Sequence, residues 1–224
     1  MADLQWPADL APHRVMFYLQ PHIGGSESPL TRVRKVYGLS APRWIARLTF
    51  RGGYDGAPRL GEAMGFGSRL DSLIADLQGG LNKAVFHDFR RPHPLQPQSR
   101  VASLRARAAV KGATALIVDG FAPRSAAFSV GDYVGGDGRP HIVSAAATIA
   151  AGGAVSGAGT IYADGSGAAT VGINPPLSAA VAADTVMTWP VPGRFTLTSE
   201  DAGQNDTDVR GLSEYTLDFT EDML

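Results

Sequence analysis

Hydrophobic and polar residues alternate along RWIARLTF, residues 43–50 of the chain. One side of an extended chain would carry Trp44, Ala46, Leu48 and Phe50, and the other Arg43, Ile45, Arg47 and Thr49. This period of two is typical of an antiparallel strand with one buried face. The same alternation recurs near the C-terminus and predicts a strand at Leu212–Thr220 that buries Tyr215, Leu217 and Phe219.

A spacing of three and four residues replaces the alternation after residue 68. The side chains that would share one face of a helix are Leu70, Leu73, Ile74 and Leu77. Ser68 is a residue type that caps helix starts, and Gly79-Gly80 is a typical helix stop. The pattern predicts one amphipathic helix over residues 69–78 and leaves Leu60–Phe66 as a candidate for a separate short helix.

Short strands separated by turns are expected along the rest of the chain. The middle part is built mainly from Ala, Gly, Val and Thr, with turn residues at the spacing found in small β-sandwiches and barrels. There we expect strands at Thr114–Val118, Asp132–Val134, His141–Ser144, Gly159–Tyr162, Ala168–Ile173 and Thr185–Trp189. Elsewhere we expect strands at Thr31–Tyr37, in residues 82–89 and at Arg194–Ser199. Loops are expected at Ile23–Pro29 and in TIAAGGAVSGAG, residues 148–159.

These patterns predict a mainly β protein with one significant α-helix. We expect residues 1–111 and 191–224 to form one β domain, because the last two strands would complete the sheet that the first part begins. Residues 112–190 would then be an inserted β domain, a small sandwich or barrel.

The composition narrows the classes of protein that the chain can be. Its 224 residues include no cysteine, which excludes disulfides, thiolate metal sites and cysteine nucleophiles. The apolar runs are too short to span a bilayer, and the first twenty residues lack the pattern of a signal peptide. We therefore expect a soluble protein that is made in the cytoplasm and does not insert into a membrane.

The net charge of −1 conceals a division of charge along the chain. Residues 1–111 carry sixteen of the twenty Lys and Arg and eight of the twenty-one Asp and Glu, a net charge of +8, and the remainder carries −9. One interpretation is a face that binds nucleic acid. The other, which we favour, is that oppositely charged regions meet within a subunit or between neighbouring subunits.

The five histidines are the first candidates for metal binding or catalysis. Their closest group is His87, Asp88 and His93, and prolines flank His93. No helical pair and no second carboxylate accompanies it at a zinc-like spacing, so we interpret these histidines as solvent-facing or hydrogen-bonded. His13, His22 and His141 each stand alone.

Other chemical candidates are equally incomplete. Asp132, Asp137 and His141 are the one local group that a hydrolase could use, but Asp132, Asp137 and Asp164 lie in turns, where aspartate favours bonds to its own backbone. The stretches GFGSRL (Gly65–Leu70) and GAGTIYADGSG (Gly157–Gly167) look like phosphate loops but lack the Lys-Ser/Thr pair. NDT, residues 205–207, matches a glycosylation acceptor only in spelling. We expect no enzymatic activity, no catalytic residue, no cofactor and no metal.

Several stretches, taken in order, resemble a known family. RWIARLTF (Arg43–Phe50) is similar to a tryptophan-bearing strand of that family, and LDSLIADLQGGLNKAVFHDFRRPHP (Leu70–Pro94) to its helix, short strand and proline loop. GATALIVDGF (Gly112–Phe121), FSVGDYVG (Phe128–Gly135) and ADGSGAATVGINPPLS (Ala163–Ser178) resemble a module of strands joined by glycine turns and ended by Pro-Pro. GRFTLTSED and TEDML resemble the closing strands. The family is that of the distal tail and related minor tail proteins of long-tailed bacteriophages.

This resemblance implies a function as well as a fold. It implies a tail-tube-like β-sandwich ring domain and a homo-oligomeric, hexameric ring in the virion at the tail tip. The ring would join the tail tube protein to the baseplate hub or tail fibre proteins, and DNA would pass through it only in transit during ejection.

A carbohydrate-binding module that contacts the host surface is the alternative function. Sugar rings stack on exposed aromatic side chains, and the candidates in the middle part of the chain are Tyr133, Tyr162 and Trp189. The competing interpretation is that all three pack in the core. A third alternative, a cell-wall hydrolase on the tail, would use Asp132, Asp137 and His141.

Overall fold

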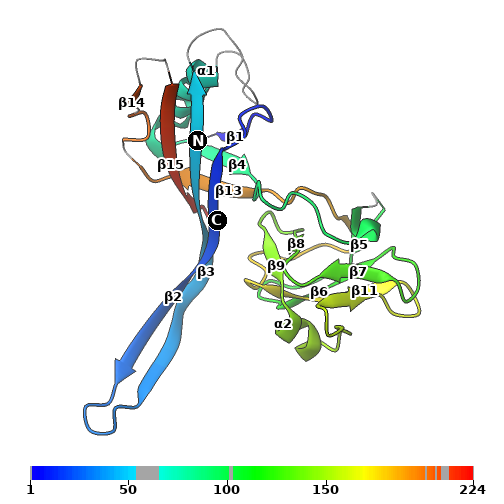
Figure 1. Cartoon of the computed structure of the whole chain (residues 1–224). Helices are drawn as coiled ribbons and strands as arrows, with labels where there is room; N and C mark the ends of the chain where they lie inside the picture. Colours follow the sequence, from blue (N-terminus) through cyan, green and yellow to red (C-terminus); the bar gives the residue numbers. More distant parts are fainter. Residues whose placement is uncertain are drawn as a thin grey trace. The chain divides into compact units, whose positions relative to one another are not determined.

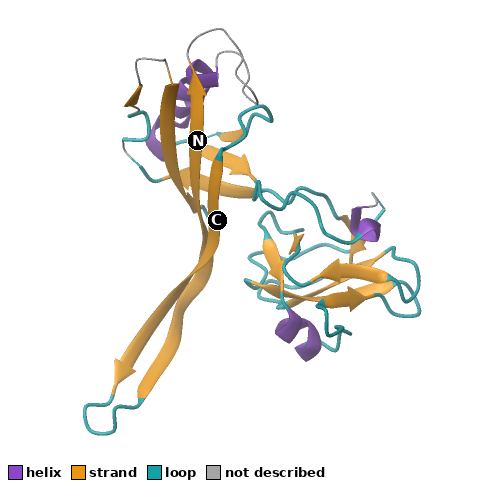
Figure 2. Ribbon diagram, viewed as in Figure 1, coloured by secondary structure: helices purple, strands orange, loops and turns teal. Residues whose placement is uncertain are grey.

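The chain divides into two compact units, each built mainly from strands (Figures 1 and 2). The computed structural model describes residues 2–53, 66–100, 103–199, 201–204, 206–207 and 212–223. Unit 1 comprises Met1–Phe86 and Arg194–Leu224, and unit 2 comprises His87–Gly193. The predicted fold class, mainly β with one significant helix, is confirmed.

Unit 1 contains, within the described residues, a seven-stranded sheet in the order β1-β4-β13-β15-β3-β2, with β14 paired to β15. The strands are β1 (Asp3–Gln5), β2 (Arg14–Glu27), β3 (Arg34–Gly53), β4 (Lys83–Phe86), β13 (Gly193–Leu197), β14 (Asp206–Thr207) and β15 (Leu212–Glu221). The pair β1–β4 is parallel, whereas β3 is antiparallel to both β2 and β15. The C-terminal strand β15 thus lies beside a strand that is more than 150 residues earlier in the sequence, as in the pair Leu217 and Leu48.

The core of unit 1 follows from the alternation in the sequence. The residues of β3 and β15 that were predicted to face inward are all buried: Trp44, Ala46, Leu48, Phe50, Tyr215, Leu217 and Phe219. Aromatic rings from further segments pack on them, among them Phe86 on Phe219, and Phe86 also stacks on Phe195 with ring centroids 4.2 Å apart. Trp6 stacks on Phe50 at 5.7 Å. Rings of this size bury large apolar areas and so contribute strongly to stability.

The helix α1 runs over Phe66–Leu77 and continues into a 3₁₀ turn, η1 (Gln78–Gly80). It begins before the predicted residue 69, so Ser68 lies inside the helix and is not its cap. The buried ring of Phe66 lies 6.3 Å from that of Phe50, and this packing extends the helix toward its N-terminus. The predicted stop at Gly79-Gly80 is confirmed, because both residues have positive φ. Most of the short helix considered at Leu60–Phe66 lies outside the described residues.

The hairpin of β2 and β3 extends beyond the other strands of its unit (Figure 1). The loop predicted at Ile23–Pro29 is wrong, because β2 continues to Glu27 and pairs with β3 down to Arg34. The strands predicted separately at Thr31–Tyr37 and Arg43–Phe50 are largely one strand. Cross-strand hydrogen bonds override the weak strand propensity of the glycines here. We call residues 20–43 the hairpin arm.

Glu221 fixes β3 at the root of the hairpin arm. The pairing of β3 with β15 ends at Ile45, and there the Glu221 carboxylate accepts a hydrogen bond from the Trp44 backbone N–H at 2.9 Å. Glu221 is 5% exposed. If its carboxylate were removed, no water would reach the Trp44 N–H to accept this hydrogen bond.

We therefore expect Glu221→Ala to lower the free energy of unfolding of unit 1 by about 1–3 kcal/mol, the cost of a buried donor without a partner. Glu221→Gln is the matched control, because its side-chain oxygen still accepts this bond. Urea denaturation of both variants measures the difference. Equal losses in the two variants would contradict the role of the acceptor oxygen.

Unit 2 contains, among the described residues, a six-stranded sheet in the order β12-β5-β6-β11-β9-β8 and a two-stranded sheet β10-β7. The strands are β5 (Arg105–Ala106), β6 (Ala115–Asp119), β7 (Ala126–Ser129), β8 (Tyr133–Val134), β9 (His141–Val143), β10 (Thr160–Tyr162), β11 (Ala168–Asn174) and β12 (Thr185–Val186). A short 3₁₀ helix, η2 (Pro97–Arg100), precedes them. Strand β11 is central, since it pairs with β6 on one side and with β9 on the other.

The boundary between the units differs from the predicted one at residues 111 and 112. Residues 87–111 belong to unit 2, because Leu104 and Ala106 lie in its core and β5 pairs with β6. The second boundary, at residues 193 and 194, lies near the predicted 190 and 191. Strand β5 is two residues long, too short to show a period in the sequence.

The stretch at residues 148–159, which was predicted to be a loop, is also more ordered than predicted. Its first residues belong to a helix, α2 (Ala145–Ala150), and Ser144 caps that helix by accepting from the Ala147 N–H. The side chain of Thr148 is buried, and its hydroxyl accepts a hydrogen bond from the Gly172 N–H of β11 at 2.8 Å. Helix α2 therefore packs directly on the backbone of the central strand.

None of the helices in the described part of the chain is both long enough and apolar enough to cross a membrane.

Candidate functional site

The structure brings two of the three residues of the predicted hydrolase group together in unit 2. His141 Nε2 lies 2.7 Å from Asp137 Oδ1, and His141 Nδ1 lies 2.7 Å from the carbonyl oxygen of Pro175. Both side chains are 0% exposed. Ser178, which the sequence did not single out, completes the group: its N–H and its hydroxyl both donate to Asp137 Oδ2, at 2.7 and 2.9 Å.

Hydrogen bonds link the whole group. The Pro175 carbonyl can only accept a hydrogen bond, so His141 Nδ1 donates to it, and Nε2 faces the carboxylate of Asp137. Burial raises the pKa of Asp137. The hydrogen bond and the charge of His141, together with the bonds from Ser178, lower this pKa by more than burial raises it, so the pKa lies far below its ordinary value.

This group has the residue types of a serine hydrolase but not their arrangement. A catalytic histidine needs one ring nitrogen that accepts the proton of the serine hydroxyl. Here the Ser178 hydroxyl bonds to the aspartate, and both nitrogens of His141 already have other partners. The arrangement instead ties the turn between β8 and β9 to the segment after β11, so its chemical effect is to hold two loops together.

Asp132 lies apart from this pair and has a different role. Its carboxylate accepts hydrogen bonds from the backbone N–H groups of Leu95 at 3.0 Å and Ser129 at 2.8 Å. Burial raises the pKa of Asp132, and these bonds offset part of the rise. The residue therefore closes the turn after β7 and fixes the proline-rich segment that precedes η2.

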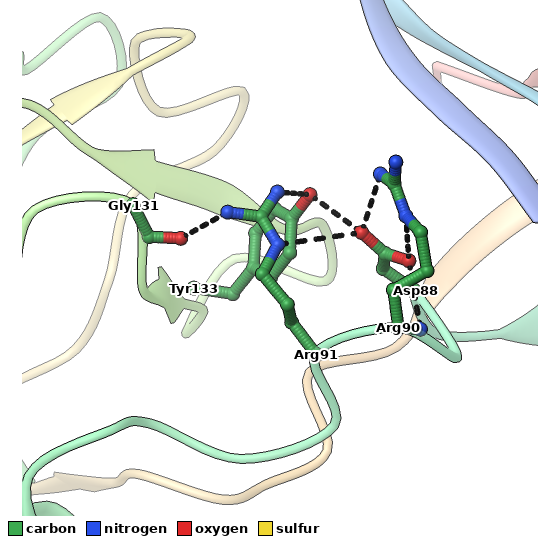
Figure 3. Close-up of polar contacts among 5 residues, drawn as sticks. All are labelled: Asp88, Arg90, Arg91, Gly131 and Tyr133. Carbon is green, nitrogen blue, oxygen red and sulfur yellow. Dashed lines mark hydrogen bonds and ion pairs between the residues drawn. The ribbon is translucent and has the colours of Figure 1, made fainter.

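Another buried carboxylate, Asp88, lies at the centre of a polar cluster (Figure 3). Its side chain is 1% exposed and accepts two bonds from the guanidinium group of Arg90, each 2.9 Å long. Arg91 lies on its other side, with Nε 3.7 Å from Asp88 Oδ2. The hydroxyl of Tyr133 donates to the same oxygen at 3.0 Å.

Arg91 connects this cluster to β8. Its guanidinium group donates to the carbonyl of Gly131 at 2.6 Å and to the hydroxyl of Tyr133 at 2.7 Å (Figure 3). Burial raises the pKa of Asp88, but the bonds from Arg90 outweigh it and the pKa lies below its ordinary value. Burial and the nearby Asp88 raise the pKa of Tyr133, so its hydroxyl stays protonated and donates. The cluster anchors the segment at residues 88–91 to its own unit.

The remaining histidines form no group with the features of a site. His87 lies against Phe89, and burial together with His93 lowers the pKa of His87. His22 Nδ1 lies 2.8 Å from the Ser40 hydroxyl in the hairpin arm, and His13 is exposed. Within the described ranges, no group of three or more His, Asp or Glu side chains could hold a metal ion.

The other motifs have structural positions as well. GFGSRL lies on α1 from Phe66 onward, and GAGTIYADGSG belongs to an antiparallel arrangement around β10. Asp164 Oδ1 accepts bonds from the N–H groups of Ser166 and Ala168 and so closes the turn before β11. Asn205 of the NDT sequence lies outside the described residues.

Of the three aromatic candidates for sugar stacking, one is exposed. Tyr162 is 43% exposed, whereas Tyr133 is buried. Trp189 packs against the core of unit 2 and donates from its indole N–H to the carbonyl of Tyr133 at 2.8 Å. Tyr133, Tyr162 and Trp189 therefore do not form one exposed platform on which a sugar ring could stack.

Unit 2 also has a pocket with a volume of about 230 Å³. It lies between the turn at residues 135–139 and the segment at residues 185–192, and Arg139 is the one charged residue of its lining. Glycines, threonines and apolar residues form the rest. The pocket adjoins the turn that Asp137 and His141 hold.

The hairpin arm exposes a set of large apolar side chains. They are Ile23, Leu30, Val33, Val36, Tyr37 and Leu39. Each of them is more than half exposed, and Leu30 at the tip is 93% exposed. Exposed apolar side chains that gather on one segment are typical of protein–protein interaction sites.

No model of a known protein family matches the chain, and a search of curated proteins finds no match.

Proposed function

We propose that the protein is a structural subunit of the tail of a long-tailed bacteriophage. It forms a homo-oligomeric ring at the tail tip, between the tail tube protein and the hub or tail fibre proteins. The hairpin arm is the observation that carries this proposal. A two-stranded ribbon is marginally stable by itself in water, and this one exposes six large apolar side chains, so it requires a partner surface.

The polar groups of the chain support a structural role. Two carboxylates of unit 2, Asp88 and Asp137, have both their oxygens engaged in bonds within the unit. On the exposed face of the sheet in unit 1, Arg47 pairs with Asp218 at 2.6 Å and Arg51 with Glu214 at 2.9 Å. Such paired arginines bind phosphate weakly, which suits a ring through which DNA passes without being retained.

The size and shape of the purified protein test the proposal. We expect light scattering to give a multiple of the 23.5 kDa chain mass and negative-stain images to show rings. Mass spectrometry of purified tails should find the chain among their components. A chain that stays monomeric at high concentration and is absent from the particle contradicts the proposal.

A further inference from the structure

The two faces of the hairpin arm carry the same kind of surface. Residues that are adjacent on a strand point to opposite faces, so Val36 and Tyr37 lie on opposite sides of the ribbon. Val36 is paired with Gly25 and shares its face with Ile23, whereas Tyr37 is paired with Gly24 and its ring lies over that glycine. The exposures of Val36 and Tyr37 are 55% and 52%. Neither face of the arm is the polar one.

A ribbon that lies on a flat surface would need one apolar face only. The usual antiparallel strand has one side toward a core and a polar side toward water. The arm departs from this rule on both strands, because Ile23 and Val36 are exposed on one face and Tyr37 on the other. Surfaces on both sides of the ribbon are needed to remove these side chains from water.

The root of the arm is rigid. Phe17 of β2 and Trp44 of β3 stack with ring centroids 5.0 Å apart, and both are buried. Together with the bond from the Trp44 N–H to Glu221, this packing fixes where the two strands leave the sheet. A partner therefore meets an arm of set direction, which lowers the entropic cost of binding.

The charge of the arm favours a second copy of the chain as its partner. Residues 20–43 carry four basic residues and one acidic residue, a net charge of +3. The rest of unit 1 carries eight basic and fourteen acidic residues, a net charge of −6. Complementary charge steers association and fixes register. The rest of unit 1 in a second copy carries the opposite net charge, whereas a phosphate backbone would leave the apolar side chains of the arm uncovered.

We propose that the hairpin arm inserts between other copies of this chain, so that both its faces are covered by their unit 1 surfaces. This proposal rests on the proposed function, since it requires a homo-oligomer. It adds that the arm is enclosed on two sides, so each copy must contact at least two others through this one segment.

The absence of cysteine makes a direct test simple. The full chain is prepared as Val36→Cys and as Tyr37→Cys, a matched pair on opposite faces, and the rate of reaction with a maleimide is measured. We expect both thiols to react at least about tenfold more slowly in the assembled protein than after its dissociation by dilution and salt. In the assembled protein, labelling requires the interface to open. Light scattering on the same samples gives the oligomeric state.

The outcomes separate the two proposals. Protection at both positions in an oligomer supports insertion. Protection at one position only, or at neither, in a chain that scatters as an oligomer overturns insertion and leaves the proposed function standing. A monomer that reacts fast at both positions overturns both proposals.

A crosslink identifies what covers the arm. Benzophenone maleimide on either cysteine should, after illumination, give a product of twice the chain mass with crosslinked peptides from unit 1. Crosslinks that fall only in unit 2 overturn the assignment of the surface. Protection of a monomeric chain by an added DNA duplex overturns the choice of a second copy in favour of nucleic acid.

Discussion

Replacing Asp137 by alanine should lower the free energy of unfolding of unit 2 by about 3–5 kcal/mol, because it breaks a buried pair and leaves His141 without its partner. His141 lies between Asp137 and the Pro175 carbonyl with both ring nitrogens engaged, and neither side chain reaches water. The same change removes the acceptor of the Ser178 N–H and hydroxyl. Hydrogen exchange, followed separately for peptides of the two units, should show faster exchange in unit 2 with little change in unit 1.

An exposed ion pair in the same unit is the matched control. Arg107 pairs with Asp119 through two bonds of 2.7 Å, but both side chains are about half exposed. Exposed pairs contribute little to stability, so Asp119→Ala should leave the melting temperature almost unchanged. Similar losses for Asp119→Ala and Asp137→Ala would show that burial of the Asp137 pair is not what stabilises the loops.

The effect of Asp137 should depend on pH in a defined direction. Its pKa is lower in the folded protein than in the unfolded chain, so the ionised carboxylate stabilises the fold. This contribution is complete above the ordinary carboxyl pKa of about 4 and is lost as the pH falls toward the lowered value. The difference between the wild type and Asp137→Asn should therefore shrink as the pH falls below about 4.

Much of the fold could be predicted from periodicity, because one buried face per strand leaves a direct trace in the sequence. The alternation at Trp44–Phe50 and at Tyr215–Phe219 identified the inner face of β3 and β15. Strand β11 and the turn before it were expected at nearly their observed positions. What periodicity could not show is the hairpin arm, since a ribbon exposed on both faces has no apolar period to detect.

The polar sites were harder to predict, because their partners are distant in the sequence. Asp137 and His141 are four residues apart and were considered together, but Ser178 is 41 residues from Asp137. Asp88 was noted beside His87, whereas its partners are Arg90, Arg91 and Tyr133, the last of them 45 residues away. The run of charges in DFRRP, residues 88–92, is the local signal that could have indicated a buried ion pair.

Gly172→Ala should destabilise unit 2 by about 3 kcal/mol or more, although alanine is an ordinary residue in a strand. The backbone of Gly172 is not in the left-handed region, so the cost comes from contact alone. A Cβ at this position would overlap the backbone of Ala147 and Thr148 in α2. Backbone atoms of a packed helix cannot turn aside as a flexible side chain can, so α2 must move away from β11.

That movement also breaks a buried hydrogen bond. The Gly172 N–H donates to the hydroxyl of Thr148, and the same hydroxyl donates to the carbonyl of Ser144 at 2.6 Å. Gly165→Ala in the turn before β11 is the matched control, because a Cβ there meets nothing within 4 Å. Thermal unfolding of the two variants should show a large decrease in melting temperature for Gly172→Ala alone. If Gly172→Ala and Gly165→Ala have the same melting temperature, helix α2 does not rest on β11, and the close packing of the central strand is wrong.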